Sequence, residues 1–202
     1  FSGNAVVVKV SEWTTYSLVH CFERVLHEAL IKAGYSPDLV SFIIGYGDSG
    51  AALIKSGVDH VFFIGSPSTG KRVMQAASET LTPVTLELGG KDAFIVCQDV
   101  DLDNVVDYAC RAIFINCGQN CVAAERFYVH EKVYDKFVQA VISQTKKLRQ
   151  GPTVCKVDGL KESEMYEMGA MTMDGEIERI EKMVQEAVQQ GAKIEVGGGR
   201  NK

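Results

Sequence analysis

The residues best suited to chemistry stand in two short glycine-containing stretches, LELGGK and GQNC. Cys121 closes the second stretch, and Glu87 lies 34 residues before it (121 − 87) in the first. A thiolate is a strong nucleophile, particularly near a helix end or backbone donors. A carboxylate at the end of a buried strand, between leucines, becomes a better general base because burial raises its pKa. The two stretches therefore indicate a nucleophile and a base.

Each residue also has a plainer interpretation. A single cysteine is more often an inert thiol in the core than a nucleophile, since cysteine is frequently buried. Glu87 alone could equally be a salt-bridged glutamate, with Lys91 as its partner. Cys117 suggests a disulfide with Cys121, but Gly118 is expected to break the helix between them, so a shared face is not assured.

Several turns carry weaker signals for a cofactor. Gly65 and Ser66 follow a strand and precede a helix, and helix N-termini bind phosphate through free N–H groups. The spacing GSPSTG is not the dinucleotide fingerprint, so Ser66 could simply be an ordinary helix cap. GYGDSG, at 45–50, is a similar turn. Lys9 and Glu12 flank the end of the first strand, where ligands of open sheets collect, although a solvated ion pair is the simpler alternative.

The elements that must position these residues alternate between strand and helix. β-branched or apolar runs predict strands, and apolar residues at helical spacing, starting with Leu18 and ending before Gly34, predict helices. This alternation predicts an α/β fold with doubly wound parallel sheets. The double glycine at 89–90 is the expected domain boundary. The expected strands are 5–10, 39–44, 60–64, 84–88, 93–96, 126–129 and 193–196, and the expected helices are 14–33, 51–55, 67–79, 102–117, 133–148 and 174–190.

Composition narrows the class of protein. The chain has 202 residues, 46% hydrophobic and 23% charged, with a net charge of −5 and no basic block, which argues against nucleic acid as a partner. No apolar run is long enough for a membrane span. The six cysteines form no CxxC pair and only four histidines are present, so we expect neither a metal site nor a disulfide framework, and an intracellular setting. The missing initiator Met and the final loop suggest a fragment truncated at both ends.

Four stretches together resemble one family. VTLELGGKDAF (84–94) and FINCGQNCVAAER (114–126) resemble the glutamate and cysteine signatures of the aldehyde dehydrogenase superfamily. GNAVVVKVSEWT (3–14) is similar to its strand with a cofactor-binding lysine and glutamate, and FFIGSPSTGKRV (62–73) to its pyrophosphate turn. The resemblance is strong from residue 3 to about 150 and looser to 198.

The resemblance implies roles for individual residues. Cys121 would attack the carbon of an aldehyde and form a thiohemiacetal, then a thioester, and its N–H would be one oxyanion donor. Glu87 would activate the water that hydrolyses the thioester. The carboxylate of Glu12 suits a free ribose hydroxyl, so NAD is favoured over NADP. The implied cofactor contacts are Lys9 and Glu12 to the adenosine ribose, Gly45 to adenine, Gly65 and Ser66 to the pyrophosphate, and Leu88 and Gly89 to the nicotinamide.

The same resemblance implies the organisation of a longer protein. Residues 1–89 would be the C-terminal part of the NAD-binding domain and residues 90–202 the N-terminal part of the catalytic domain, in a homodimer or homotetramer. The family's Pro-Trp-Asn stretch, with its other oxyanion donor, would precede Phe1, and its Glu-x-Phe-Gly-Pro stretch would follow Lys202. We therefore expect the isolated fragment to be inactive.

Two departures and two alternatives stand beside this assignment. Ala124-Glu125 replaces the family's common Gly followed by Ser or Thr, and 151–173 matches poorly. One alternative is a coenzyme-A-acylating enzyme, against which Glu87 argues because no water would need activation. The other is a non-catalytic fragment or binding module.

Overall fold

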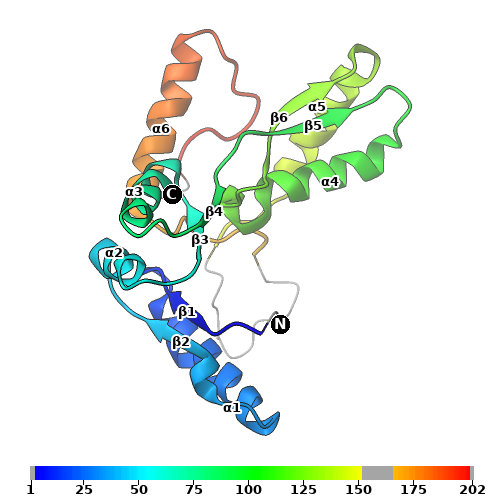
Figure 1. Cartoon of the computed structure of the whole chain (residues 1–202). Helices are drawn as coiled ribbons and strands as arrows, with labels where there is room; N and C mark the ends of the chain where they lie inside the picture. The colour runs from blue at the N-terminus through cyan, green and yellow to red at the C-terminus, as the bar shows by residue number, and fades with distance from the viewer. Residues whose placement is uncertain (1–2, 152–165, 201–202) are drawn as a thin grey trace. The chain divides into compact units, whose positions relative to one another are not determined.

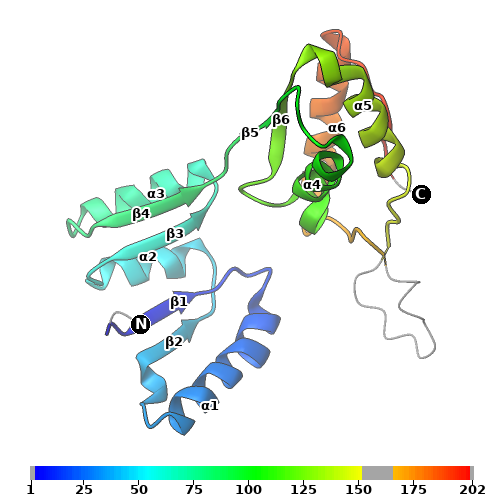
Figure 2. The same ribbon diagram turned by 90° about the vertical axis from the view of Figure 1, so that its right-hand side faces the viewer.

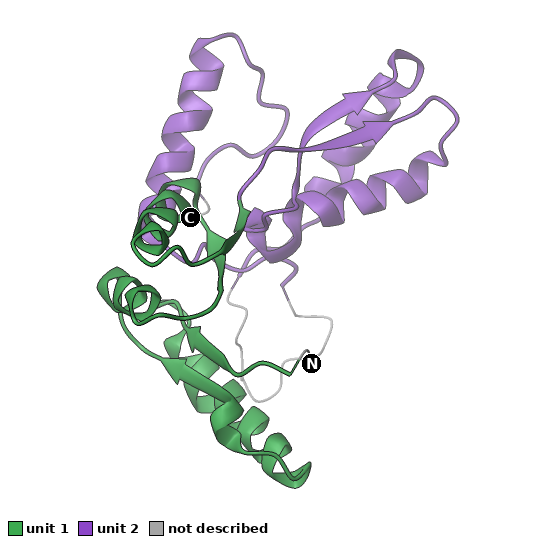
Figure 3. Ribbon diagram, viewed as in Figure 1, with its two compact units in different colours: residues 1–88 green, residues 89–202 purple. Residues whose placement is uncertain are grey.

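A computed structural model describes residues 3–151 and 166–200 of the chain. The chain forms two compact units, residues 1–88 and residues 89–202 (Figure 3). The division falls one residue before the expected boundary at 89/90. The assignment of the two units to a cofactor-binding and a catalytic domain remains a prediction.

The first unit contains two pairs of parallel strands, each joined by a helical crossover (Figure 2). β1 (Val6–Lys9) pairs with β2 (Val40–Ile43), and β3 (Val61–Gly65) pairs with β4 (Val84–Leu88). Parallel neighbours require such crossovers, because the chain must return to the same end of the sheet. The helical segments of this unit are Tyr16–Glu23, α1 (Arg24–Lys32), Pro37–Leu39, α2 (Gly47–Lys55) and α3 (Pro67–Ser78).

Side-chain alternation gives β3 and β4 one covered face. Val61 and Val84 pack with the buried Ile54, Ala76 and Ala77 of α2 and α3. Successive side chains alternate along a strand, so the neighbours of these valines in sequence point to the other face of the sheet. In β4 these residues are Thr85 and Glu87. This alternation decides where Glu87 points.

Among its described residues, the second unit has one parallel strand pair and three α-helices. β5 (Asp92–Val96) pairs with β6 (Ala124–Val129), and α4 (Leu102–Phe114) and α5 (Glu131–Thr145) pack against it (Figure 1). Asp101 caps α4 by accepting a hydrogen bond from the Asn104 N–H at 3.4 Å. The core consists of Val96, Val106, Ala109 and Phe137. α6 (Asp174–Gln189) completes the unit.

The structure corrects three details of the predicted helices. The helix expected from residue 14 is a π-helix over Tyr16–Glu23, where the hydroxyls of Thr14, Thr15 and Ser17 bond to backbone carbonyls and compete with the regular ladder. Gly47 and Gly50, expected in a turn, lie within α2. α4 ends at Phe114, four residues before Gly118.

The strand expected at 193–196 is absent from the described second unit. A strand needs a neighbour to bond with, and here Lys193 pairs with Glu195 while Ile194 is 46% exposed. Most of the loop expected at 151–173 lies outside the described residues. No helix among the described residues is long and apolar enough to cross a membrane.

Candidate active site

Cys121 lies in an exposed turn between α4 and β6. A hydrogen bond of 3.1 Å from the Ala123 N–H to the Asn120 carbonyl closes this turn. The Cys121 side chain is exposed, and its Sγ donates to the Asn120 Oδ1 at 3.8 Å. The interpretation of Cys121 as a buried core thiol is therefore wrong. All five described cysteines are free thiols, including Cys117.

Among the described residues, the backbone of the turn leaves the N–H groups of Asn120 and Cys121 available. The Gln119 N–H donates to Asn116 O, and the Val122 N–H donates to Asn120 Oδ1 at 3.3 Å. Ala123 closes the turn, as above. Within residues 3–151 and 166–200, the Cys121 N–H has no acceptor. A free N–H on the residue that carries the nucleophile suits an oxyanion donor.

Three consecutive left-handed residues deliver the chain into this turn. The φ angles of Asn116, Cys117 and Gly118 are 53°, 61° and 73°. Glycine adopts this conformation without strain and asparagine tolerates it, whereas Cys117 does not favour it. A Cβ at Gly118 would also lie 3.3 Å from the Ile113 carbonyl. The sharp reversal after α4 thus depends on residues suited to positive φ.

The end of LELGGK lies against the cysteine turn. A Cβ at Gly90 would lie 3.9 Å from the Cys121 carbonyl oxygen, so Gly90 is a neighbour of the cysteine turn, and 2.7 Å from Asp92 Oδ1, so a larger residue would displace this carboxylate. The Lys91 carbonyl accepts a hydrogen bond of 2.6 Å from Arg126 Nε. The Lys91 ammonium forms an ion pair with Glu125. These contacts attach the residues after Glu87 to the residues after Cys121.

Glu125 lies at an irregularity in the pairing of β6 with β5. Asp92 faces Ala124 while Ala93 faces Arg126, so Glu125 has no partner in β5. Such a bulge turns a side chain out of the regular pattern. Lys91 is thereby occupied by Glu125, and not by Glu87 as the salt-bridge alternative proposed.

Glu87 is exposed, which corrects the expectation that its neighbours desolvate it. Leu86 and Leu88 are half-buried while Thr85 and Glu87 are exposed. The leucines lie on the opposite face of β4, because side chains alternate along a strand. Glu87 and Cys121 belong to different compact units.

Two predicted ribose ligands meet at the end of β1. Lys9 Nζ and Glu12 Oε2 lie 3.7 Å apart, with side chains 20% and 43% exposed. Lys9 is paired in register with Ile43, so the chain enters Gly45 beside it. Gly45 has φ of +143°, and a Cβ there would collide with the Ser49 hydroxyl. The three residues predicted around adenosine thus lie at the carboxyl ends of neighbouring strands.

The predicted pyrophosphate and nicotinamide residues meet at the ends of β3 and β4. Gly65 is the register partner of Leu88. Ser66 caps α3, with its Oγ accepting from the Thr69 N–H at 3.2 Å, and contacts the hydroxyls of Ser68 and Thr69 at 2.9 and 3.0 Å. This confirms the cap interpretation, and it also gathers three hydroxyls at a helix N-terminus, which suits a phosphate.

Gly70 and Gly89 lie near this end of the sheet in different surroundings. A Cβ at Gly70 would lie 3.0 Å from Leu88 Cδ2, so α3 packs closely on β4. Gly89 has no atom within 4 Å of a built Cβ. Within the part of the chain that the structure describes, the first turn of α3 contributes only the Ser68 N–H, because Pro67 has none and the N–H groups of Thr69 and Gly70 bond to Ser66. The hydroxyls, this N–H and the glycine backbone fit a dinucleotide such as the predicted NAD.

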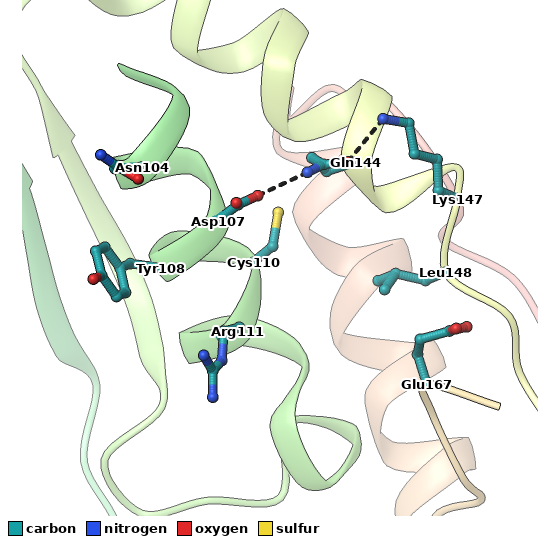
Figure 4. Close-up of a pocket in the computed structure, with 9 residues that line it drawn as sticks. All are labelled: Asn104, Asp107, Tyr108, Cys110, Arg111, Gln144, Lys147, Leu148 and Glu167. Atoms are coloured by element: carbon teal, nitrogen blue, oxygen red, sulfur yellow. Dashed lines mark hydrogen bonds between the residues drawn. The ribbon is translucent and has the colours of Figure 1, made fainter. Parts of the chain in front are cut away.

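A surface hollow in the second unit lies elsewhere. It is lined by residues of α4 and α5 with Lys147, Leu148 and Glu167 (Figure 4). One of the lining residues is Cys110, whose pKa is raised by burial and by Asp107. None of the predicted site residues lines it. In this hollow Gln144 Nε2 donates to Asp107 at 2.8 Å.

Sequence reasoning missed Gln119. Its side-chain amide bonds to Asn116 O at 3.0 Å and to the Thr172 N–H at 2.9 Å. Its place in GQNC was the only local signal, since Thr172 lies 53 positions along the chain (172 − 119).

Known proteins resemble this chain throughout. The model of the aldehyde dehydrogenase family matches residues 1–202. A mitochondrial benzaldehyde dehydrogenase from Antirrhinum majus is 39% identical over 201 residues, which cover 98% of this chain and 35% of that protein. The cytosolic aldehyde dehydrogenase 1 of Elephantulus edwardii is 37% identical over 211 residues, with 98% and 37% covered.

A solved structure of an aldehyde dehydrogenase is also similar to this chain. Betaine aldehyde dehydrogenase from Staphylococcus aureus, in complex with NAD+, matches with a TM-score of 0.83 and 32% identity, over 100% of this chain and 38% of that one. The chain thus spans little more than a third of the length of these relatives. Its two units of parallel strands and crossover helices have the α/β fold of these enzymes. The chain belongs to the aldehyde dehydrogenase family.

Proposed function

We propose that the full-length native protein oxidises an aldehyde to a carboxylic acid with NAD, with Cys121 as nucleophile and Glu87 as general base. The observation that carries this proposal is the exposed Cys121, whose own N–H is available while the N–H groups of Gln119, Val122 and Ala123 are engaged. A nucleophile and an oxyanion donor on one residue suit attack on a carbonyl.

The reaction follows from these groups. The Cys121 thiolate adds to the aldehyde carbon, and the oxyanion accepts a hydrogen bond from the Cys121 N–H. A bound NAD would supply the acceptor for the hydride on this carbon, and with the loss of that hydride the thiohemiacetal held by Cys121 would become a thioester. Glu87 removes a proton from water, which attacks the thioester and releases the acid and the Cys121 thiol. Aldehyde, NAD+ and water thus give acid, NADH and a proton.

The exposure of Glu87 on the open face of β4 supports this role, since a base must reach water. Lys9, Glu12 and Gly45 are proposed to hold the adenosine, Gly65 and Ser66 the pyrophosphate, and Leu88 and Gly89 to lie beside the nicotinamide. The Glu12 carboxylate would repel a 2′-phosphate, so we propose a preference for NAD over NADP. A lower KM for NADP than for NAD would contradict it.

Two variants test the chemistry by separating acylation from hydrolysis. In Cys121→Ala, NADH formation from a panel of aldehydes is expected to fall at least about a thousandfold. In Glu87→Gln, a first rapid burst of NADH is expected to survive while steady turnover falls by about 10²- to 10⁴-fold, because only hydrolysis lacks its base. Undiminished activity of Cys121→Ala would refute the proposal.

The same assay addresses the acylating alternative. With coenzyme A added, water is expected to remain the acceptor and the acid the product. Formation of acyl-coenzyme A in place of the acid would reverse the ranking, and no NADH from any aldehyde would favour a binding module.

We further infer that residues 1–89 belong to the NAD-binding domain and 90–202 to the catalytic domain of an intracellular homodimer or homotetramer. Light scattering coupled to gel filtration of the native protein tests the oligomeric state, and a monomer would contradict it.

A further inference from the structure

The side chain of Gln119 bridges two parts of the second unit that are distant in sequence. Its Nε2 donates to the Asn116 carbonyl at 3.0 Å, and its Oε1 accepts from the Thr172 N–H at 2.9 Å. In return, the Asn116 side-chain Nδ2 donates a hydrogen bond of 2.9 Å to the Gln119 carbonyl. Gln119 therefore uses its donor within the turn and its acceptor on the segment before α6.

This bridge lies at the point where the turn most needs support. Residues 116–118 are left-handed, and a non-glycine chain keeps such a conformation only where its surroundings hold it. Asn116 and Gln119 clamp the segment from both sides, and Cys121 follows two residues later. A shift at Gln119 would therefore be carried directly to the Sγ of Cys121.

The segment that supplies Thr172 has its own attachment to the unit. Glu167 forms an ion pair of 2.5 Å with Arg149, just after α5, and accepts from the Arg149 N–H at 2.8 Å. The segment is thus fixed to the end of α5 independently of the cysteine turn. Thr172 can serve as a fixed point against which the turn is set.

We propose that Gln119 is a positioning residue, which fixes the location of Cys121 by tying its turn to the Thr172 N–H. The proposal rests on the proposed function, in which Cys121 is the nucleophile. Gln119 itself takes no part in bond making. Its loss should therefore lower kcat, because misplacement of a reacting atom by about 1 Å can cost about a hundredfold, and leave the KM for NAD unchanged.

The experiment compares two substitutions of Gln119 in the full-length protein. Gln119→Leu keeps the approximate size and removes both hydrogen bonds, so kcat is expected to fall about 10- to 100-fold. Gln119→Glu keeps an acceptor for the Thr172 N–H and loses the donor, so its kcat is expected to lie between Leu and wild type. Gln144→Leu removes a hydrogen bond to Asp107 on the surface of the same unit and is the matched control, with kcat within about twofold of wild type.

Alkylation separates positioning from damage to the fold. The rate at which iodoacetamide labels Cys121, followed by peptide mass spectrometry, is expected to change less than about threefold in Gln119→Leu, since the thiol is already exposed. Labelling that falls in parallel with kcat would show loss of the thiol's accessibility and would overturn the proposal.

A double-mutant cycle tests the bridge itself. Thr172→Pro removes the N–H that donates to Gln119 Oε1, and this change alone should lower kcat. Added to Gln119→Leu, it should lower kcat by less than a further twofold, because the hydrogen bond that Thr172→Pro removes is already absent in Gln119→Leu. Fully additive losses would overturn the proposal.

The outcomes distinguish this proposal from the proposed function. Wild-type kcat in all Gln119 and Thr172 variants, with Cys121→Ala inactive, would refute positioning alone. Full activity of Cys121→Ala would refute the proposed function. If Gln119→Leu fails to fold, Gln119→Glu and Thr172→Pro decide by the same criteria.

Discussion

The left-handed backbone before Cys121 limits which residue types suit position 117. Cys117 has φ of 61°, where a non-glycine side chain costs about 1–2 kcal/mol. Cys117→Gly is expected to raise the free energy of unfolding by up to about 1 kcal/mol, since relief of strain exceeds the added entropy of the unfolded chain. Cys117→Val should lower it by about 1–2 kcal/mol, because a β-branched residue is least suited to positive φ. Denaturant titration of both variants measures the difference, and equal stabilities would contradict the account.

A pH titration reports on the attachment of the segment that carries Thr172. The pKa of Glu167 is lowered from 4.5 to about 2, because the side chain and the backbone of Arg149 donate hydrogen bonds to it. A lowered pKa in the folded state means that the stabilisation is complete above the ordinary value and is lost as the pH falls toward 2. Both side chains are exposed, so the effect should be small.

The expected result is a Tm difference that depends on pH. Wild type should melt above Glu167→Gln at pH 6, and the two should converge near pH 2. A constant difference across this range would contradict a contribution from the carboxylate charge. Glu178→Gln, another glutamate-to-glutamine change in the same unit, serves as the control for the loss of one charge.

The sequence predicted Cys121 and Glu87 but not their surroundings. Long signatures surround both residues, and the roles implied by them remain proposals. The prediction that Glu87 is buried was wrong, because residues that flank it in a strand point to the opposite face of the sheet. Gln119 could not be found, because its partner Thr172 is brought near only by folding.

At the scale of elements, the contact of α3 with β4 depends on Gly70. Gly70→Ala gains about 1 kcal/mol of helix propensity, and its Cβ would approach Leu88 Cδ2 at 3.0 Å, so we expect a net change within about 1 kcal/mol. Gly70→Val should destabilise by about 1–3 kcal/mol through overpacking. It should also raise the KM for NAD, because Leu88 must move. Stability loss without a change in KM would separate Leu88 from the cofactor site.

The elements show which patterns were sufficient for prediction. β4 was predicted with its observed bounds, Val84–Leu88, because its alternating apolar residues stand between a proline before the strand and a glycine pair after it. The strand at 193–196 was wrong, because its pattern is local whereas a strand requires a partner. The π-helix at Tyr16–Glu23 differs from an α-helix only in hydrogen-bond spacing, which apolar periodicity does not resolve.

At the scale of the whole molecule, the described residues expose an unusual number of large apolar side chains. Large apolar side chains such as Phe22, Phe62, Ile64 and Ile95 are more than half exposed. The chain also spans 35% of the length of the benzaldehyde dehydrogenase that it matches. Much of this surface would suit contacts with the rest of a longer protein.

The isolated 202-residue chain is therefore expected to bind a hydrophobic dye such as ANS and to form little or no NADH. The full-length native protein, as control, should bind little dye. Cooperative unfolding without dye binding, or robust NADH formation by the isolated chain, would contradict this expectation.

The alternation along β4 has a consequence for how this chain can change in length. Glu87 points to the open face only because an odd number of steps separates it from Leu86 and Leu88. One inserted residue would exchange the faces, burying the carboxylate under α3 and exposing the leucines, whereas two would restore both. Parity, and not length alone, thus limits insertions and deletions in this strand, and even-numbered changes are the tolerable ones.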